Sequence, residues 1–305
     1  MPDALAGDVV LQAGMARAVL RPQAGARVCE LTLPHPDGHA VAILYPYRAA
    51  GVDPINWAKG GIYPLLPYSN RIANGWLQHA DGQTQLPPHP NADPHSLHGH
   101  AHVVPWQLLS QGTCSAHLRL VSAPCAAWPW RVQGDLGVTL SADALHLTLL
   151  LTNLDPAAMP AGVGFHPYFV HDPRARLRYQ AGRRWSAHAD GLAHSSDPLP
   201  PADGFAVPRP LRDGTLTDYL SEWDGALDLE LPHGELLHIG AEAPLSHLVV
   251  HRPADLPYLC IEPVSHVADG FNLAALGVGG TGSVVLTSGA QLQGRMTLRL
   301  TDAVF

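Results

Sequence analysis

The chain has 305 residues, of which only 14% are charged, and its formal net charge is −8 at pH 7. This acidic balance argues against a nucleic-acid partner, which requires a basic surface. No stretch of 18 or more apolar residues occurs, so the sequence predicts no membrane-spanning helix and no membrane partner.

The turn-forming residues, the first residues of the chain and the cysteines each predict a further property. Glycine and proline number 29 each, which is typical of many short strands joined by turns. Residues 1–8 contain no basic region followed by an apolar core, so no signal peptide is expected. The four cysteines are scattered without a C-x-x-C motif, and we expect free thiols in a cytoplasmic protein that is a monomer or a homodimer.

Short strand-like segments follow one another along the whole chain. The clearest is 145–153, where leucine at every second position predicts one buried face of a strand. No amphipathic helix of ten or more residues is predicted, and the pattern favours an all-β sandwich or barrel. The segment 197–212 is rich in proline and glycine, but it is not predicted to be a linker between domains. The principal expected strands are 9–20 (two strands), 27–33, 41–45, 106–110, 116–121, 130–140, 145–153, 227–231, 236–239, 246–251, 258–261, 283–287 and 292–300.

The first polar motif is 67–75, which lies between apolar residues. Arg71 offers five donors in a rigid fork, which suits an oxygen-rich ligand, although a structural ion pair is the alternative. Asn70 and Asn74 either contact the same ligand or stabilise turns.

The second motif, 95–102, contains four histidines in eight residues. If this segment is a strand, His98, His100 and His102 lie on one face and form a candidate metal site, as in a cupin. However, no acidic residue follows within a few positions, and no H-E-x-x-H motif occurs.

The third and fourth motifs each place a titratable residue before a proline. His166 precedes Pro167 and two aromatic residues, and we expect it at a strand end with a fixed ring direction. A half-buried core histidine is the alternative interpretation. Glu262 precedes Pro263 after an apolar strand, so its carboxylate either enters a cleft or lies at a solvated strand end.

Taken together and in order, these motifs resemble the aldose 1-epimerase (mutarotase) family. The similarity rests on 60–72, Leu97-His98-Gly99, 164–169, Ile261-Glu262-Pro263 and Phe271-Asn272, and it extends over nearly the whole chain. It implies a single domain over residues 1–305 that forms a large antiparallel β-sandwich. It also implies an open cleft for a small-molecule sugar, with no metal and no organic cofactor.

The resemblance assigns roles to individual residues. His166 corresponds to the general acid that protonates the ring oxygen, and Glu262 to the general base at the anomeric hydroxyl. His98 and Arg71 correspond to residues that hold the ring-oxygen side. An aspartate that binds sugar hydroxyls is expected near 216–225, and Asp218 is the predicted residue.

Asn70 is predicted to bind substrate beside Arg71. The expected reaction interconverts the α and β anomers of a free hexose such as glucose or galactose. A histidine with a pKa near ~6.5 and a glutamate that is ionised above ~4.3 suit this chemistry, and we expect them on opposite sides of the sugar.

Two other functions share the same motifs. The first is a non-catalytic carbohydrate-binding protein, because a fold does not fix a function. The second is a hexose-phosphate mutarotase, in which Arg71, Arg183, Arg184 or Arg252 would reach the phosphate.

Overall fold

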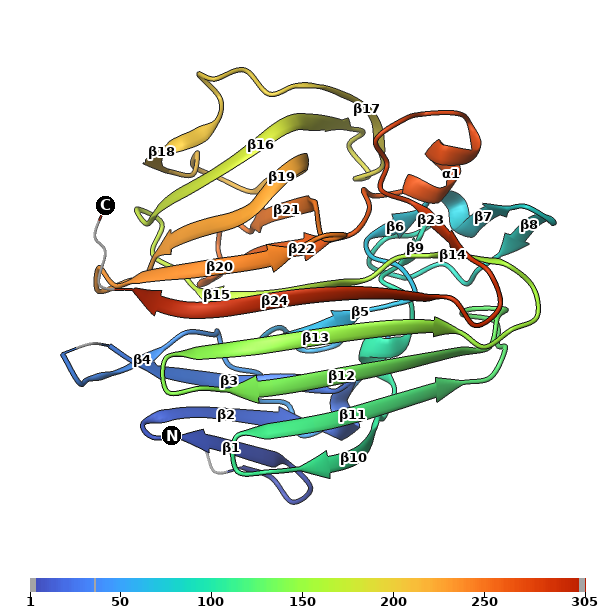
Figure 1. Ribbon diagram of the computed structural model, residues 1–305. Helices are drawn as coiled ribbons and strands as arrows, with labels where there is room; N and C mark the ends of the chain where they lie inside the picture. Colours follow the sequence, from blue (N-terminus) through green and yellow to red (C-terminus); the bar gives the residue numbers. More distant parts are fainter. Residues whose placement is uncertain (1–3, 36, 302–304) are drawn as a thin grey trace.

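The computed structural model describes residues 4–35, 37–301 and 305, which fold almost entirely into antiparallel strands (Figure 1). Within these residues, only α1 (Gly270–Ala275) is an α-helix, and three short 3-10 turns occur at Pro22–Ala24, Ala73–Gly75 and Ala101–Val103. None of the described helices is long and apolar enough to span a membrane. The all-β prediction is therefore confirmed.

Two ladders of antiparallel strands lie against each other and meet at β19 (Leu216–Glu230). The first ladder runs in the order β10 (Gln107–Gln111), β11 (Ser115–Ser122), β12 (Val132–Leu140), β13 (Ala144–Asn153), β24 (Gln291–Thr301), β20 (Leu236–Glu242) and β19. The second runs in the order β1 (Val9–Ala13), β2 (Ala16–Arg21), β3 (Arg27–Pro34), β5 (Ile62–Leu65), β15 (Gly164–Val170), β22 (Tyr258–Val264), β21 (His247–Arg252) and β19.

The remaining strands extend or flank this large sandwich. Strand β16 (Arg176–Ala187) pairs with β19 and also carries β17 (Ala193–Pro198) and β18 (Phe205–Pro210). The segment 197–212 therefore contains the end of β17 and all of β18, with irregular chain between them. The smaller pieces are β4 (Ala40–Ala42) on β3 and the pairs β6 (Arg71–Ile72) with β9 (Ser96–Leu97), β7 (Trp76–His79) with β8 (Gly82–Gln85), and β14 (Met159–Ala161) with β23 (Val284–Leu286).

Strand β13 shows why the sequence forms this architecture. Its leucines at 145, 147, 149 and 151 are at most 2% exposed, while residues between them face outward. One apolar face packs into the core between the ladders, and burial of each such side chain stabilises the fold by roughly 1.5–3 kcal/mol. The predicted alternation is confirmed here.

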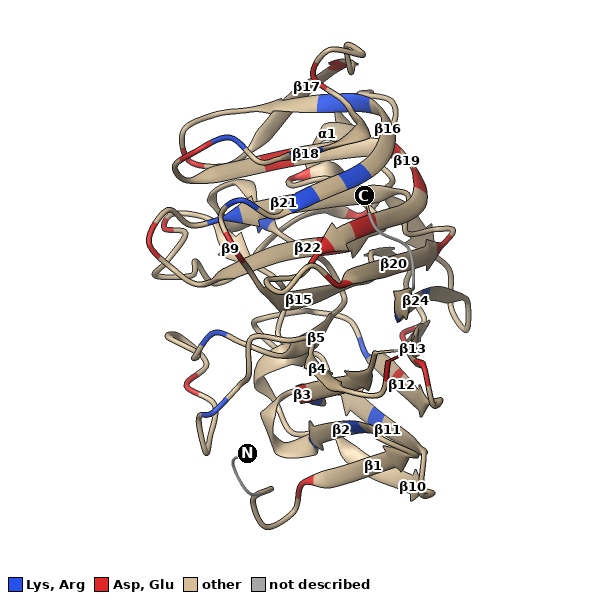
Figure 2. Cartoon of the chain, turned by 90° about the vertical axis from the view of Figure 1, so that its left-hand side faces the viewer, with Lys and Arg blue, Asp and Glu red and all other residues tan. Residues whose placement is uncertain are grey.

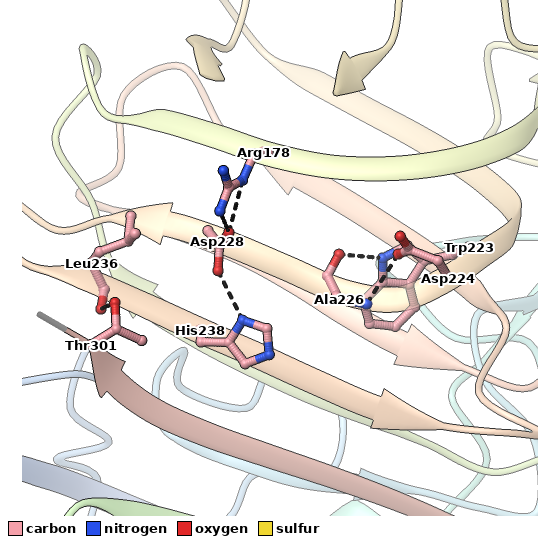
Figure 3. A network of polar contacts seen from close by, with 8 residues as sticks. All are labelled: Arg178, Trp223, Asp224, Ala226, Asp228, Leu236, His238 and Thr301. Atoms are coloured by element: carbon pink, nitrogen blue, oxygen red, sulfur yellow. Dashed lines mark hydrogen bonds and ion pairs between the residues drawn. The ribbon is translucent and has the colours of Figure 1, made fainter. Parts of the chain in front are cut away.

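The outer face of the sandwich is held by polar contacts across strands. Asp228 on β19 accepts hydrogen bonds from Arg178 on β16, at 2.9 Å, and contacts the ring of His238 on β20 at 2.8 Å (Figure 3). The three residues are direct neighbours in the register of these strands. This network therefore lies where three adjacent strands expose their polar sides.

Candidate active site

A cavity of about 270 Å³ opens beside β5, β15 and β22, and five predicted site residues line it. They are Asn70, Arg71, His98, His166 and Glu262. The chain brings these residues together from four separate motifs, because β15 lies between β5 and β22 in the second ladder.

His166 is the third residue of the seven in β15, so the expectation that it ends a strand is wrong. Pro167 is tolerated here because the pairing of β15 with β22 is interrupted between Gly164 and Tyr168. The ring of His166 stacks against both Tyr63 and Tyr168, with centroid distances of 4.6 and 4.7 Å. These two tyrosines fix the plane of the imidazole.

The carboxylate of Glu262 lies beside this ring, with its Oε1 at 3.3 Å from Nε2 of His166. The two side chains are only 5% and 8% exposed. Glu262 Oε2 and His166 Nδ1 form no hydrogen bond within the described part of the chain. An imidazole and a carboxylate are therefore direct neighbours in this buried pocket.

Burial shifts the pKa values of this pair in opposite directions. Desolvation raises the pKa of Glu262 to about 8, and the nearby Arg71 guanidinium only partly opposes this shift. Desolvation also lowers the pKa of His166 well below its usual value. Burial thus favours the proton on Glu262, which opposes the expectation of a carboxylate that is ionised at neutral pH.

The short strands β6 and β9 position Asn70 and His98. The backbone amide of His98 donates to the Asn70 carbonyl at 2.9 Å, and the Asn70 amide donates to His98 Nδ1 at 3.0 Å. Since Nδ1 accepts, the ring proton resides on Nε2. His98 stands edge-on to His166 with ring centroids 5.2 Å apart, and Asn70 Oδ1 accepts a 3.3 Å hydrogen bond from Arg71 Nη1.

The segment that follows Glu262 supports this arrangement. His266 Nε2 accepts a hydrogen bond from the Ser69 amide at 3.1 Å, and Asp269 Oδ1 accepts one from the Ala73 amide at 2.9 Å. The Asp269 amide in turn donates to the carbonyl of Arg71 at 2.8 Å. The two motifs that flank the pocket are thus fastened together at both ends of the Asn70–Arg71 turn.

Thr217 and Asp218 are consecutive residues of β19, so their side chains lie on opposite faces of the strand. Thr217 lines the pocket, and its hydroxyl lies 2.8 Å from His251 Nδ1. Asp218 does not line this pocket; its carboxylate lies 3.7 Å from Arg184 Nε and 3.9 Å from Arg212 Nη2. The structure therefore does not bring the predicted Asp218 beside His166, and a one-residue shift along β19 explains the difference.

The predicted common face for His98, His100 and His102 is wrong. Strand β9 ends at Leu97, and His98 adopts a left-handed backbone with φ of 60°. His100 contacts the Ser122 hydroxyl at 2.9 Å, whereas the buried ring of His102 stacks on Tyr63 at 4.9 Å. His98 and His102 stay edge-on neighbours at 6.1 Å, but His100 is bound to Ser122, so the three histidines do not share the face of a strand as in a cupin.

Of the four arginines proposed to reach a phosphate, Arg71 lines the pocket and the other three do not. Basic residues gather on β16 (Figure 2), where Arg183 binds the Ser196 carbonyl and Arg184 faces Asp218. Arg252 donates to the Gly214 carbonyl at 2.9 Å. The second cation that does line the pocket is Lys59, which the sequence analysis did not single out.

One group in the pocket has the composition of a metal site. Ligand atoms of His166, Cys260 and Glu262 lie within 4.8 Å of one another. Burial raises the pKa of the Cys260 thiol well above its usual value, so the thiolate that a metal prefers is disfavoured.

Comparisons with known proteins agree with the fold. The family model for aldose 1-epimerase matches residues 8–299. The chain is 27% identical to the uncharacterized protein YphB of Escherichia coli K12 over 267 residues, which cover 85% of this chain and 88% of that protein.

Two solved structures share the architecture. A provisionally named aldose 1-epimerase from Escherichia coli K12 superimposes with a TM-score of 0.82 at 24% identity, covering 96% of this chain and 98% of that chain. The GalM/aldose epimerase homologue from C. elegans gives a TM-score of 0.80 at 16% identity and covers 97% and 98% of the two chains.

The class of protein is thus a galactose mutarotase-like β-sandwich with a buried histidine–glutamate pair in its pocket. The match of the family model over nearly the whole chain identifies the family: this chain belongs to the aldose 1-epimerase family.

Proposed function

We propose that this protein is a mutarotase that interconverts the α and β anomers of a free hexose such as glucose or galactose. The observation that carries the proposal is the 3.3 Å contact between His166 Nε2 and Glu262 Oε1. The anomeric hydroxyl oxygen and the ring oxygen of an aldose are bonded to the same carbon. A base and an acid that serve both oxygens must therefore be neighbours, as these two residues are.

In the proposed mechanism, Glu262 takes the proton of the anomeric hydroxyl while the bond from the anomeric carbon to the ring oxygen breaks. His166 delivers its proton to that ring oxygen, which yields an open-chain aldehyde with a free hydroxyl. The aldehyde turns about its bond to the second carbon, and the hydroxyl attacks the other face. His166 recovers its proton during the attack, and Glu262 returns its own to the new anomeric hydroxyl.

The pair holds one proton throughout this cycle. It alternates between ionised glutamate with protonated histidine and protonated glutamate with neutral histidine. Burial disfavours both charges, which is why it raises the pKa of Glu262 and lowers that of His166. We infer that the buried site keeps the two proton arrangements close in free energy. In the ionised form the two opposite charges attract each other, whereas the neutral form avoids the cost of desolvation.

The proposed sugar contacts come from the rest of the lining. Arg71 and Asn70 supply hydrogen-bond donors beside Glu262, and His98 presents its Nε2 proton on the ring-oxygen side. Tyr168 and Tyr63 line the cavity as aromatic surface. Thr217 takes the place that the sequence analysis gave to Asp218 as a group for sugar hydroxyls.

The direct test follows the optical rotation of freshly dissolved α-glucose, α-galactose and other free aldoses with and without the protein. Faster relaxation to the same final rotation supports the proposal. Saturable sugar binding without any acceleration would instead identify a non-catalytic carbohydrate-binding protein.

One observation favours a hexose-phosphate mutarotase as the second candidate. Lys59 lines the pocket, and its Nζ lies 4.9 Å from the centroid of the Trp57 ring rather than in an ion pair with a described carboxylate. Hexose 6-phosphates therefore belong in the same assay, with their rate constants compared with those of the free sugars. A cytoplasmic location and a monomeric or homodimeric state stay predictions from the sequence.

A further inference from the structure

A second group of candidate ligands lies far from the pocket motifs, in the turn between β3 and β4. The side chains of His35, Asp37 and His39 converge there, and one ligand atom from each lies within 4.8 Å of the others. Asp37 Oδ1 is 3.0 Å from His35 Nδ1 and 2.5 Å from His39 Nδ1. Two backbone hydrogen bonds, from the His35 amide to the His39 carbonyl and from the Gly38 amide to the His35 carbonyl, hold the turn closed.

A buried carboxylate from another turn orients one of these histidines. Glu235 lies just before β20 and is 7% exposed, and its Oε1 is 3.3 Å from His39 Nε2. Its second oxygen is buried without a hydrogen-bond partner within the described residues. A carboxylate that accepts from the far ring nitrogen is the usual support of a metal-binding histidine, since it fixes the tautomer and leaves Nδ1 for the ion.

The chemistry of the ligand set matches a zinc-type ion. Two imidazoles with one carboxylate form a common three-residue zinc set, and water completes the coordination. The side chain of His39 is 50% exposed and that of Asp37 is 61% exposed, so an ion can enter from solvent. We propose that His35, Asp37 and His39 form a binding site for Zn²⁺ or a similar divalent transition-metal ion, with Glu235 as the positioning residue.

Hydrogen bonds and ring stacking already hold the three side chains of this turn together. Hydrogen bonds from His39 and His35 lower the pKa of Asp37 to about 2, so its carboxylate is ionised at neutral pH. Hydrogen bonds to Asp37 and Glu235 raise the pKa of His39, whose ring also stacks on His35 at 4.7 Å.

Calorimetric titration of Zn²⁺ into untagged protein freed of metal by a chelator tests the site. We expect one equivalent to bind to the wild type at pH 7.5, and the His35→Ala and His39→Ala variants to lose at least about 100-fold in affinity. Glu235→Gln keeps all three ligands but loses the charged support, so a loss of about 10–100-fold is expected. His117→Ala is the matched control, because His117 is a surface histidine that contacts a single carboxylate, Asp135, at 2.8 Å.

The outcomes separate this site from the catalytic pocket. The proposal is supported if His35→Ala, His39→Ala and Glu235→Gln bind Zn²⁺ more weakly while His117→Ala binds it like the wild type. This holds whatever the mutarotase assay shows. Wild-type affinity in both His35→Ala and His39→Ala would overturn it, as would the absence of Zn²⁺ binding by the wild type. Equal affinity in Glu235→Gln and the wild type would remove Glu235 from the site.

Discussion

The same chemical pair, an imidazole beside a carboxylate, behaves in opposite ways at two places in this molecule. In the pocket, burial raises the pKa of Glu262 to about 8 and lowers that of His166. At the β3–β4 turn, hydrogen bonding lowers the pKa of Asp37 to about 2 and raises that of His39. The residue types are similar, but the side chains of the first pair are at most 8% exposed and those of the second at least 50% exposed.

Water access explains the difference. At the surface, both charges stay solvated, so their attraction decides the protonation and favours the ion pair. In the pocket, removal of water penalises each charge and offsets much of the attraction between them. A buried pair of this kind can exchange one proton at little cost, which is what the proposed ring opening requires.

Breaking the buried pair should have the largest effect. His166→Asn and Glu262→Gln each remove one proton transfer, and we expect each to lower kcat/KM for mutarotation by about 10²–10⁴-fold. Polarimetry on the best substrate measures this change. Asp228→Asn is the control, since it alters the surface pair with His238 and should keep the wild-type rate. A near-wild-type rate in either pocket variant would show that its assigned role is wrong.

The pH dependence of the rate should follow the buried pair. Activity needs one proton shared by Glu262 and His166, and the raised pKa of Glu262 keeps that proton up to about pH 8. Above that pH, kcat/KM should fall by about tenfold per pH unit as the proton is lost. A second proton binds only well below pH 6.5, because burial lowers the pKa of His166. A rate that rises steadily from pH 7 to pH 9.5 would contradict this picture.

The two pairs should also respond to pH with opposite effects on stability. Glu262 has a raised pKa in the folded state, so its contribution is full below the unfolded value of 4.5 and is lost as the pH rises through about 8. The free energy of unfolding of the wild type should therefore fall relative to Glu262→Gln by up to about 1.4 kcal/mol per pH unit in this window.

The lowered pKa of Asp37 has the reverse sign. Its contribution is present above pH 3.8 and is lost as the pH falls through about 2. The small difference in the free energy of unfolding between Asp37→Asn and the wild type should therefore disappear only in acid. Urea unfolding of the two variants at about pH 2, 4.5, 7 and 9 checks both directions. A constant difference in the free energy of unfolding between Glu262→Gln and the wild type from pH 4.5 to pH 9 would refute the raised pKa of Glu262.

A smaller effect should show which side of β19 meets the sugar. Thr217→Val removes one hydroxyl that lines the pocket, and the loss of about 0.5–1.5 kcal/mol should raise KM by about 2–10-fold. Asp218→Asn, on the opposite face of the strand, should leave KM unchanged. Steady-state polarimetry distinguishes them, and the reverse result would restore Asp218 as the sugar-binding residue.

The smallest effect is expected at the surface network of Figure 3. Asp228→Asn weakens the contacts with Arg178 and His238, and exposed pairs of this type contribute at most about 1 kcal/mol. Thermal unfolding should show a small decrease in Tm that shrinks further at high salt. A large loss would mean that this network supports the strands more strongly than a solvated pair can.

The sequence by itself determined the class of fold and most members of the site. Alternating leucines in 145–153 and turn residues between short apolar runs specify strands, because side-chain period and burial are local properties. His98, His166 and Glu262 stood out because each is a functional residue type in an unusual local setting. Resemblance of four motifs to one family then ordered them into a single hypothesis.

Only the tertiary structure decided how these residues are placed and protonated. Whether Thr217 or Asp218 faces the pocket depends on the register of β19, which a one-residue shift reverses. The pKa of Glu262 depends on how much water the surrounding strands exclude, and Glu235 reaches His39 only because two distant turns meet. Desolvation and long-range contact are properties of the packed molecule, so the linear pattern of residues does not contain them.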